Sequence, residues 1–125
     1  MIIGTGIDIV KNQRIERLIK KYGERFLQKI YLASEIQYCS KQTNYAASYA
    51  ARFAAKEALL KALGTGMRNN SWQDIEILNN DLGKPEVKLY NKTAEQAAEM
   101  NVEKIFLTIS HEKDFSIAQI ILEGA

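Results

Sequence analysis

A chain of 125 residues with 46% hydrophobic and 26% charged side chains is typical of one globular domain with one core, so we expect a single domain spanning residues 1–125. The net charge of +2 is too small to indicate nucleic-acid binding by itself, and the single cysteine, Cys39, excludes an intramolecular disulfide and a cysteine-rich zinc site. No apolar run approaches the roughly 20 residues that span a bilayer, and "MIIGTGIDIV" lacks the features of a secretion signal, so we expect a cytoplasmic protein that does not enter the membrane.

The first predicted element is a strand over residues 2–10, "IIGTGIDIV", which is rich in isoleucine. Alternation places Gly4, Gly6, Asp8 and Val10 on one face of this strand. A glycine inside a strand often marks the close approach of another backbone or a ligand. Asp8 therefore shares its face with two residues that have no side chain.

An amphipathic helix is predicted after this strand in "NQRIERLIKKYG", with Asn12 as its N-cap and Gly23 as its terminator. Three basic residues recur on it at helical spacing: Arg14, Arg17 and Lys21. Such a stripe is usually a solvated helix face, but it would also attract an acidic partner helix. Two shorter helices are expected in "ERFLQKIYL" and "ASEIQYCSK", the second capped by Ser34.

A long helix is predicted from about Tyr45 to Leu63, and it contains "ARFAAKEALLKAL". Helical geometry places Glu57 and Lys61 one turn apart in the gap between two apolar sectors. An ordinary surface salt bridge explains most pairs of this kind. The apolar neighbours nevertheless indicate partial burial, and a buried carboxylate needs a partner such as a metal ion or a phosphate network.

Two charged residues of this helix, Arg52 and Lys56, fall on a different side, near Leu59 and Leu63. The second acid of interest, Asp8, is either an ordinary residue at a strand end or a magnesium ligand, since Mg²⁺ is typically held by one or two carboxylates plus substrate phosphates.

The C-terminal half changes to a period of two. "DIEIL" and "EVKLY" alternate on either side of "NNDLGKP", which predicts a hairpin, and "TAEQAAEM" predicts a short helix. "KIFLTIS" and "FSIAQIIL" predict two strands joined by "HEKD". The fold class is therefore α+β, with about five mostly antiparallel strands packed on one long helix and several short helices.

Two further features carry weak functional signals. His111, the single histidine, follows a predicted strand, and a lone histidine is more often an ordinary turn residue than a catalyst. "GTGMRNNS", which begins at Gly64, is either a helix C-cap and turn or a source of backbone N–H groups for a phosphate.

Four segments together resemble one known family: "GIDIV", "RFAAKEALLKALGTG", "DIEILNNDLGKPEVKL" and "ISHEKDFSIA". In order and spacing they are similar to the holo-[acyl-carrier-protein] synthase family, the small bacterial type of 4′-phosphopantetheinyl transferase, across essentially the whole chain. The resemblance implies the 4′-phosphopantetheinyl transferase fold. It also implies Mg²⁺-dependent transfer of 4′-phosphopantetheine from coenzyme A to a serine of apo acyl carrier protein, with release of 3′,5′-ADP, for fatty acid biosynthesis.

The resemblance also implies residue roles. Asp8 and Glu57 would bind Mg²⁺, and Lys61 would lie beside the reacting phosphate. Further members of the coenzyme A pocket would be Arg52, Gly64 and His111. The basic residues of the first helix would face the acidic carrier protein: Arg14, Arg17 and Lys21. Members of the family form homotrimers with active sites between adjacent subunits.

One region differs from the family pattern. Members often carry several basic residues shortly before the central motif, which help to bind the nucleotide end of coenzyme A. Here "SKQTNYAASYA" contains only Lys41, so the ligand of the 3′-phosphate stays unassigned.

The implied reaction needs a base for the attacking serine. Glu57, directly or through a metal-bound water, is the expected base, with His111 as the second candidate. Two other classes of function remain open: a non-catalytic module that binds coenzyme A or an acidic helical protein, and another Mg²⁺-dependent pyrophosphate enzyme such as a nucleotide hydrolase.

Overall fold

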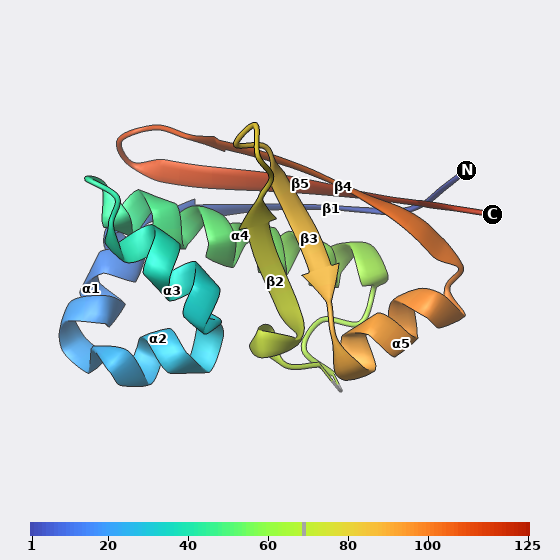
Figure 1. Cartoon of the computed structure of the whole chain (residues 1–125), viewed down its shortest axis with the longest axis horizontal. Coiled ribbons are helices and arrows are strands. Elements are labelled where there is room, and N and C mark those ends of the chain that lie inside the picture. The colour runs from blue at the N-terminus through green and yellow to red at the C-terminus, as the bar shows by residue number, and fades with distance from the viewer. Residues whose placement is uncertain (69) are drawn as a thin grey trace.

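One long helix lies along a three-stranded sheet in the computed structural model, which describes residues 1–68 and 70–125 (Figure 1). The elements in chain order are β1 (Ile2–Lys11), α1 (Asn12–Tyr22), α2 (Glu24–Ile30), α3 (Ala33–Ser40), α4 (Tyr45–Leu63), the 3₁₀ turn η1 (Trp72–Asp74), β2 (Ile75–Asn79), β3 (Pro85–Leu89), α5 (Asn91–Glu99), β4 (Val102–His111) and β5 (Phe115–Gly124). The predicted α+β class is confirmed, and no helix in the described part of the chain is long and apolar enough to cross a membrane.

The five strands form two antiparallel sheets. The larger has the order β1-β5-β4, so the first strand of the chain pairs with the last, and β2 and β3 form the predicted hairpin as a sheet of two strands. Asp8 lies opposite Ala118 of β5, which in turn lies opposite Ile109 of β4. This register places Asp8 and the end of β4 on opposite edges of the three-stranded sheet.

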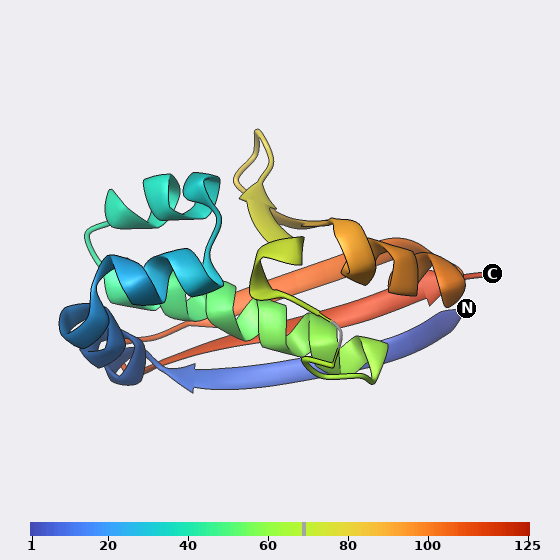
Figure 2. The same ribbon diagram turned by 90° about the horizontal axis from the view of Figure 1, so that it is seen from below.

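Helix α4 covers one face of this sheet, and the two chain termini lie at the same end of it (Figure 2). Gly4 and Gly6 make the approach of β1 to the helix very close. A Cβ atom on Gly6 would lie 2.8 Å from the backbone nitrogen of Ala62 and closer still to the carbonyl oxygen of Ala58. The predicted close backbone approach is therefore confirmed, and it is made by a helix turn rather than by a ligand.

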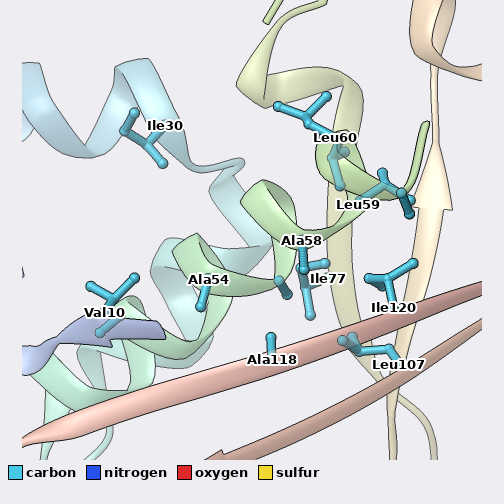
Figure 3. Packing of buried hydrophobic residues seen from close by; sticks show 14 of the residues in the cluster. Val10, Ile30, Ala54, Ala58, Leu59, Leu60, Ile77, Leu107, Ala118 and Ile120 are labelled. Atoms are coloured by element: carbon cyan, nitrogen blue, oxygen red, sulfur yellow. The ribbon is translucent and has the colours of Figure 1, made fainter. Parts of the chain in front are cut away.

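The core lies between α4 and the sheets and contains aliphatic side chains from each layer (Figure 3). Ile120 and Leu122 of β5, Ile77 of β2 and Leu59 of α4 are fully buried. Each side chain of this size contributes about 1.5–3 kcal/mol when it leaves water. Because this core fixes α4 on both sheets, residues on opposite sides of α4 keep fixed positions.

Two predicted N-caps are wrong. Asn12 is the first residue of α1 rather than its cap, and its amide donates to the carbonyl oxygens of Glu112 (3.1 Å) and Lys113 (3.2 Å) in the β4–β5 turn. The side chain of Asn12 bonds to these carbonyls, and not to the N–H groups of its own helix, because the turn folds back onto the start of α1.

Ser34 is not the cap of α3, because its hydroxyl donates to Glu76 (2.6 Å). The backbone N–H of Leu32 at this helix start donates instead to Glu35 Oε1 (2.8 Å). Gly23 ends α1 with φ +57°, as predicted, and Asn44 caps α4 by accepting from Ala47 N (3.2 Å).

Candidate functional site

Asp8 and Lys61 meet where β1 crosses α4. The Lys61 ammonium donates to Asp8 Oδ1 and to the carbonyl oxygen of Ile7, each at 3.0 Å. The Asp8 side chain is 17% exposed and that of Lys61 52% exposed, so the ion pair reaches the surface while the carboxylate is largely covered. The lysine is therefore paired across the strand–helix contact, and the expected ordinary salt bridge with Glu57 is replaced by one with Asp8.

Glu57 is half-buried on the turn of α4 before Lys61. Burial raises the pKa of its carboxyl group, and repulsion from the Asp8 carboxylate raises this pKa further, against opposing effects from Lys61 and Arg14. Two carboxylates from different elements are thus close enough for the charge of Asp8 to disfavour ionisation of Glu57.

These residues fit a magnesium ion. The donor set is two carboxylates, the hard oxygen ligands that Mg²⁺ prefers, and a cation between them would relieve the repulsion that raises the Glu57 pKa. The described residues contain no group of three or more histidine, cysteine or acidic side chains suited to a metal. The remaining positions would therefore be filled by water and substrate oxygens, the usual arrangement for Mg²⁺ at phosphates.

A separate pocket of about 420 Å³ brings Arg52 and His111 together. Arg52 is only 5% exposed; its Nη2 donates to Asn79 Oδ1 (3.0 Å) and its guanidinium lies 4.4 Å from the centre of the Tyr38 ring. Its Nε is buried without a partner among the described residues. An unsatisfied N–H on a cation at a pocket wall favours an anionic ligand such as a phosphate.

The two clusters lie at opposite edges of the sheet. Asp8 is on β1 and His111 is at the end of β4, separated by β5. Two interstrand spacings amount to about 10 Å. Within one chain the acidic cluster and the Arg52 pocket are therefore separate, which the sequence alone did not show, and we refer to them below as the two half-sites.

The other predicted site residues lie elsewhere. Gly64 is the C-cap of α4 with φ +82°, its N–H bonded to the carbonyl oxygens of Leu60 and Lys61, and it is not among the residues that line the Arg52 pocket. The capping interpretation of "GTGMRNNS" is thus confirmed at Gly64, while Asn69 lies outside the described residues. Lys41 is exposed and is also not part of the pocket lining.

All three basic residues of the predicted stripe are exposed on α1: Arg14, Arg17 and Lys21. Arg14 lies near enough to Glu57 to lower its pKa, so the N-terminal end of the basic stripe adjoins the acidic cluster.

Sequence reasoning missed Glu35, Tyr38 and Asn79, and it gave Lys56 no role. Lys56 and Glu35 form a fully buried ion pair, and Tyr38 and Asn79 hold Arg52. A lysine within an alanine- and leucine-rich stretch was a signal of burial. Glu35 left no local signal, because its partner is distant in sequence.

Comparison with known proteins gives one consistent result. The family model described as the 4′-phosphopantetheinyl transferase superfamily matches residues 4–120. A holo-[acyl-carrier-protein] synthase from Geotalea daltonii is 47% identical over 98% of this chain and 99% of its own.

Solved structures agree. A holo-[acyl-carrier-protein] synthase from Neisseria meningitidis has a TM-score of 0.89 at 38% identity, covering 98% of this chain and 99% of that one. The Helicobacter pylori protein of the same name, solved in complex with coenzyme A, has a TM-score of 0.84 at 34% identity, covering 95% and 99%. This chain therefore belongs to the holo-[acyl-carrier-protein] synthase family of 4′-phosphopantetheinyl transferases.

Proposed function

We propose that this protein transfers 4′-phosphopantetheine from coenzyme A to a serine of an apo acyl carrier protein, depends on Mg²⁺ and releases 3′,5′-ADP. The observation that carries the proposal is the meeting of Asp8, Glu57 and Lys61 at the β1–α4 contact. We assign the activity to one domain spanning residues 1–125, acting in the cytoplasm and supplying holo carrier protein for fatty acid biosynthesis. The free thiol of buried Cys39 suits such a reducing compartment.

In this proposal Asp8 and Glu57 hold the metal ion. Mg²⁺ bound there would polarise the pyrophosphate of coenzyme A and offset the charge of its oxygens. The Lys61 ammonium, anchored by the carbonyl oxygen of Ile7, adds a fixed positive charge beside the phosphoryl group that is attacked. It stabilises charge that builds on the phosphoryl oxygens as the P–O bond to 3′,5′-ADP breaks.

Glu57 is also our candidate for the base that takes the serine proton. Its carboxylate lies near Asp8 and Lys61, where the reacting phosphate is expected, so it would take the serine proton directly or through a metal-bound water. His111 lies in the other half-site of the same chain, so it would reach the serine only from a neighbouring subunit.

The Arg52 pocket is our candidate for the nucleotide end of coenzyme A. Arg52 offers an unpartnered Nε–H, and His111, Asn79 and Tyr38 lie in the same pocket lining. The Helicobacter pylori relative was solved in complex with coenzyme A, which supports a nucleotide-binding role for this fold. The basic side of α1, next to the acidic cluster, is the proposed docking surface for the acidic carrier protein.

We further propose that the complete active site forms between copies of the chain in a homotrimer. The half-sites lie at opposite sheet edges, and the sheet face away from α4 carries exposed apolar side chains, among them Ile7 (54%), Ile9 (60%) and Phe106 (45%). A second copy seated on this face would bury these residues and bring β1 of one subunit near the pocket of its neighbour.

Ile9→Lys should therefore dissociate the assembly and abolish turnover while leaving the fold of each chain intact. Light scattering after size exclusion measures the mass, and circular dichroism measures the fold. Leu82→Lys, which adds the same charge at a 93% exposed leucine in the hairpin turn, is the matched control and should change neither. A wild-type protein that is monomeric while active would contradict the proposal.

Lys61→Ala should lower kcat by about 10²- to 10³-fold, because it removes positive charge that acts in the transition state. The free energy of unfolding should fall by only about 1 kcal/mol, because the Lys61 end of the ion pair is half exposed even though the Asp8 carboxylate is largely covered. Steady-state kinetics and thermal unfolding measure the two effects, with exposed Lys92→Ala as control. Normal kcat together with a large loss of stability would assign Lys61 a structural role.

The function itself is tested by mixing the protein with apo carrier protein, coenzyme A and Mg²⁺ and measuring the mass of the carrier. A gain of one phosphopantetheine group is expected. Coenzyme A binding without this gain would indicate a binding module. Cleavage of coenzyme A without any carrier protein would indicate a pyrophosphate hydrolase instead.

A further inference from the structure

A buried ion pair lies next to the Arg52 pocket. The Lys56 ammonium is 2.7 Å from Glu35 Oε1, and both side chains are 0% exposed. The pair links α4 to α3, which are joined in the chain by the segment 41–44. Burial lowers the pKa of Lys56, and the Glu35 carboxylate opposes this effect.

The remaining hydrogen bonds of Lys56 attach two further segments to α4. Its ammonium donates to the carbonyl oxygen of Ile30 (2.8 Å) at the end of α2 and to that of Trp72 (3.1 Å) in η1. All three N–H groups of the ammonium therefore have an acceptor.

The Glu35 carboxylate attaches a third segment. Its Oε1 also accepts from the backbone N–H of Leu32 (2.8 Å), and its Oε2 accepts from the backbone N–H of Ile77 (2.8 Å) in β2. The two side chains thus fix α2, α3, η1 and β2 to α4.

Three of these elements, α3, β2 and α4, also supply the wall of the Arg52 pocket. Tyr38 is one turn after Glu35 on α3, Asn79 is two residues after Ile77 on β2, and Arg52 is one turn before Lys56 on α4. Residues at these spacings lie on the same side of their element. The three wall residues also contact one another: Arg52 donates to Asn79, and it stacks on Tyr38.

Electrostatics alone does not explain a pair of this kind. Apolar side chains of similar volume often stabilise a core as well as a buried ion pair does. What the ion pair adds is a set of directional hydrogen bonds that fix the positions of the elements relative to one another. We propose that Glu35 and Lys56 form a positioning pair that sets the spacing of Tyr38, Asn79 and Arg52 and thereby the affinity for the nucleotide end of coenzyme A. This inference rests on the proposed function.

Glu35→Gln should raise KM for coenzyme A and the Kd for 3′,5′-ADP, each about tenfold, because small displacements of binding groups weaken binding strongly. The kcat at saturating coenzyme A and the KM for the carrier protein should stay within about twofold, since Asp8, Glu57 and Lys61 lie in the other half-site. Kinetics and calorimetry with 3′,5′-ADP measure these quantities at a temperature at which each variant is folded.

A second variant separates positioning from stability. Glu35→Gln/Lys56→Gln removes both charges, leaves no unpaired ion in the core and keeps hydrogen-bonding groups of similar size, yet it should retain the raised KM and Kd. Leu122→Ala, at a fully buried position of β5, is a matched destabilised control and should keep both values.

Wild-type values of KM and Kd in the folded double variant would overturn the positioning role and leave the proposed function intact. If the wild-type protein neither transferred the group nor bound 3′,5′-ADP, the proposed function would fail, and this inference with it.

Discussion

Glu57→Gln should reduce transfer to the carrier protein by about a thousandfold, the upper end of the range seen when a group acting in the transition state is removed. The amide is nearly the same size as the carboxylate, but it neither accepts the serine proton nor supplies an anionic ligand to Mg²⁺. Kinetics at saturating Mg²⁺ measure the effect, and Glu95→Gln at an exposed position of α5 is the matched control. Full turnover of Glu57→Gln would refute the assigned role.

The same substitution, which lowers turnover, should not lower the stability of the metal-free protein near neutral pH. Burial and repulsion from Asp8 raise the pKa of Glu57, so the folded state binds its proton more tightly than the unfolded state. Stability therefore falls as the pH rises through this folded-state pKa, and the penalty is absent below the unfolded-state pKa. Without Mg²⁺ near neutral pH, Glu57→Gln should be at least as stable as the wild-type protein. Urea unfolding at several pH values should show that the difference in the free energy of unfolding between the two proteins becomes smaller as the pH is lowered.

Gly6→Ala should cost about 3 kcal/mol of stability, the upper part of the usual range for overpacking. The added Cβ would lie 2.8 Å from Ala62 N and closer to the Ala58 carbonyl oxygen, and both are helix backbone atoms that have no freedom to move aside. The strand must then shift away from α4, which also separates Asp8 from Glu57, so turnover should fall together with stability. Urea unfolding and kinetics measure both effects.

The matched control for Gly6→Ala is Gly23→Ala. Gly23 has φ +57° and ψ −133° with open space around its Cα, so alanine there should cost about 1–3 kcal/mol through backbone strain alone, with turnover unchanged. A Gly6→Ala protein with wild-type stability and turnover would show that the close contact does not position the cluster.

Local pattern was sufficient to predict most of the fold. Alternation and turn chemistry predicted the strands and the hairpin, and the composition of "YAASYAARFAAKEALLKAL" predicted α4 with the bounds that the structure has. The glycine face of β1 singled out Asp8, because glycines there indicated a close neighbour. The pairing of the first and last strands, and the division into two sheets, depend on contacts between distant residues that leave no local signal.

The site was only partly predictable for the same reason. Helical spacing offered Glu57 as the natural partner of Lys61, but the close approach of β1 supplied a nearer carboxylate, Asp8. Helical spacing did not reveal the buried partner of Lys56 either, because Glu35 belongs to another helix. The catalytic roles that we propose for Asp8, Glu57 and Lys61 rest on the family resemblance together with this geometry.

The most direct measurement follows both products of one reaction. Wild-type protein, apo carrier protein, coenzyme A and Mg²⁺ should yield holo carrier protein and 3′,5′-ADP in equal amounts, and neither product should form when Mg²⁺ is chelated or when Glu57 is glutamine. Release of 3′,5′-ADP without an equal gain of holo carrier protein, or full transfer without a divalent cation, would contradict the assignment.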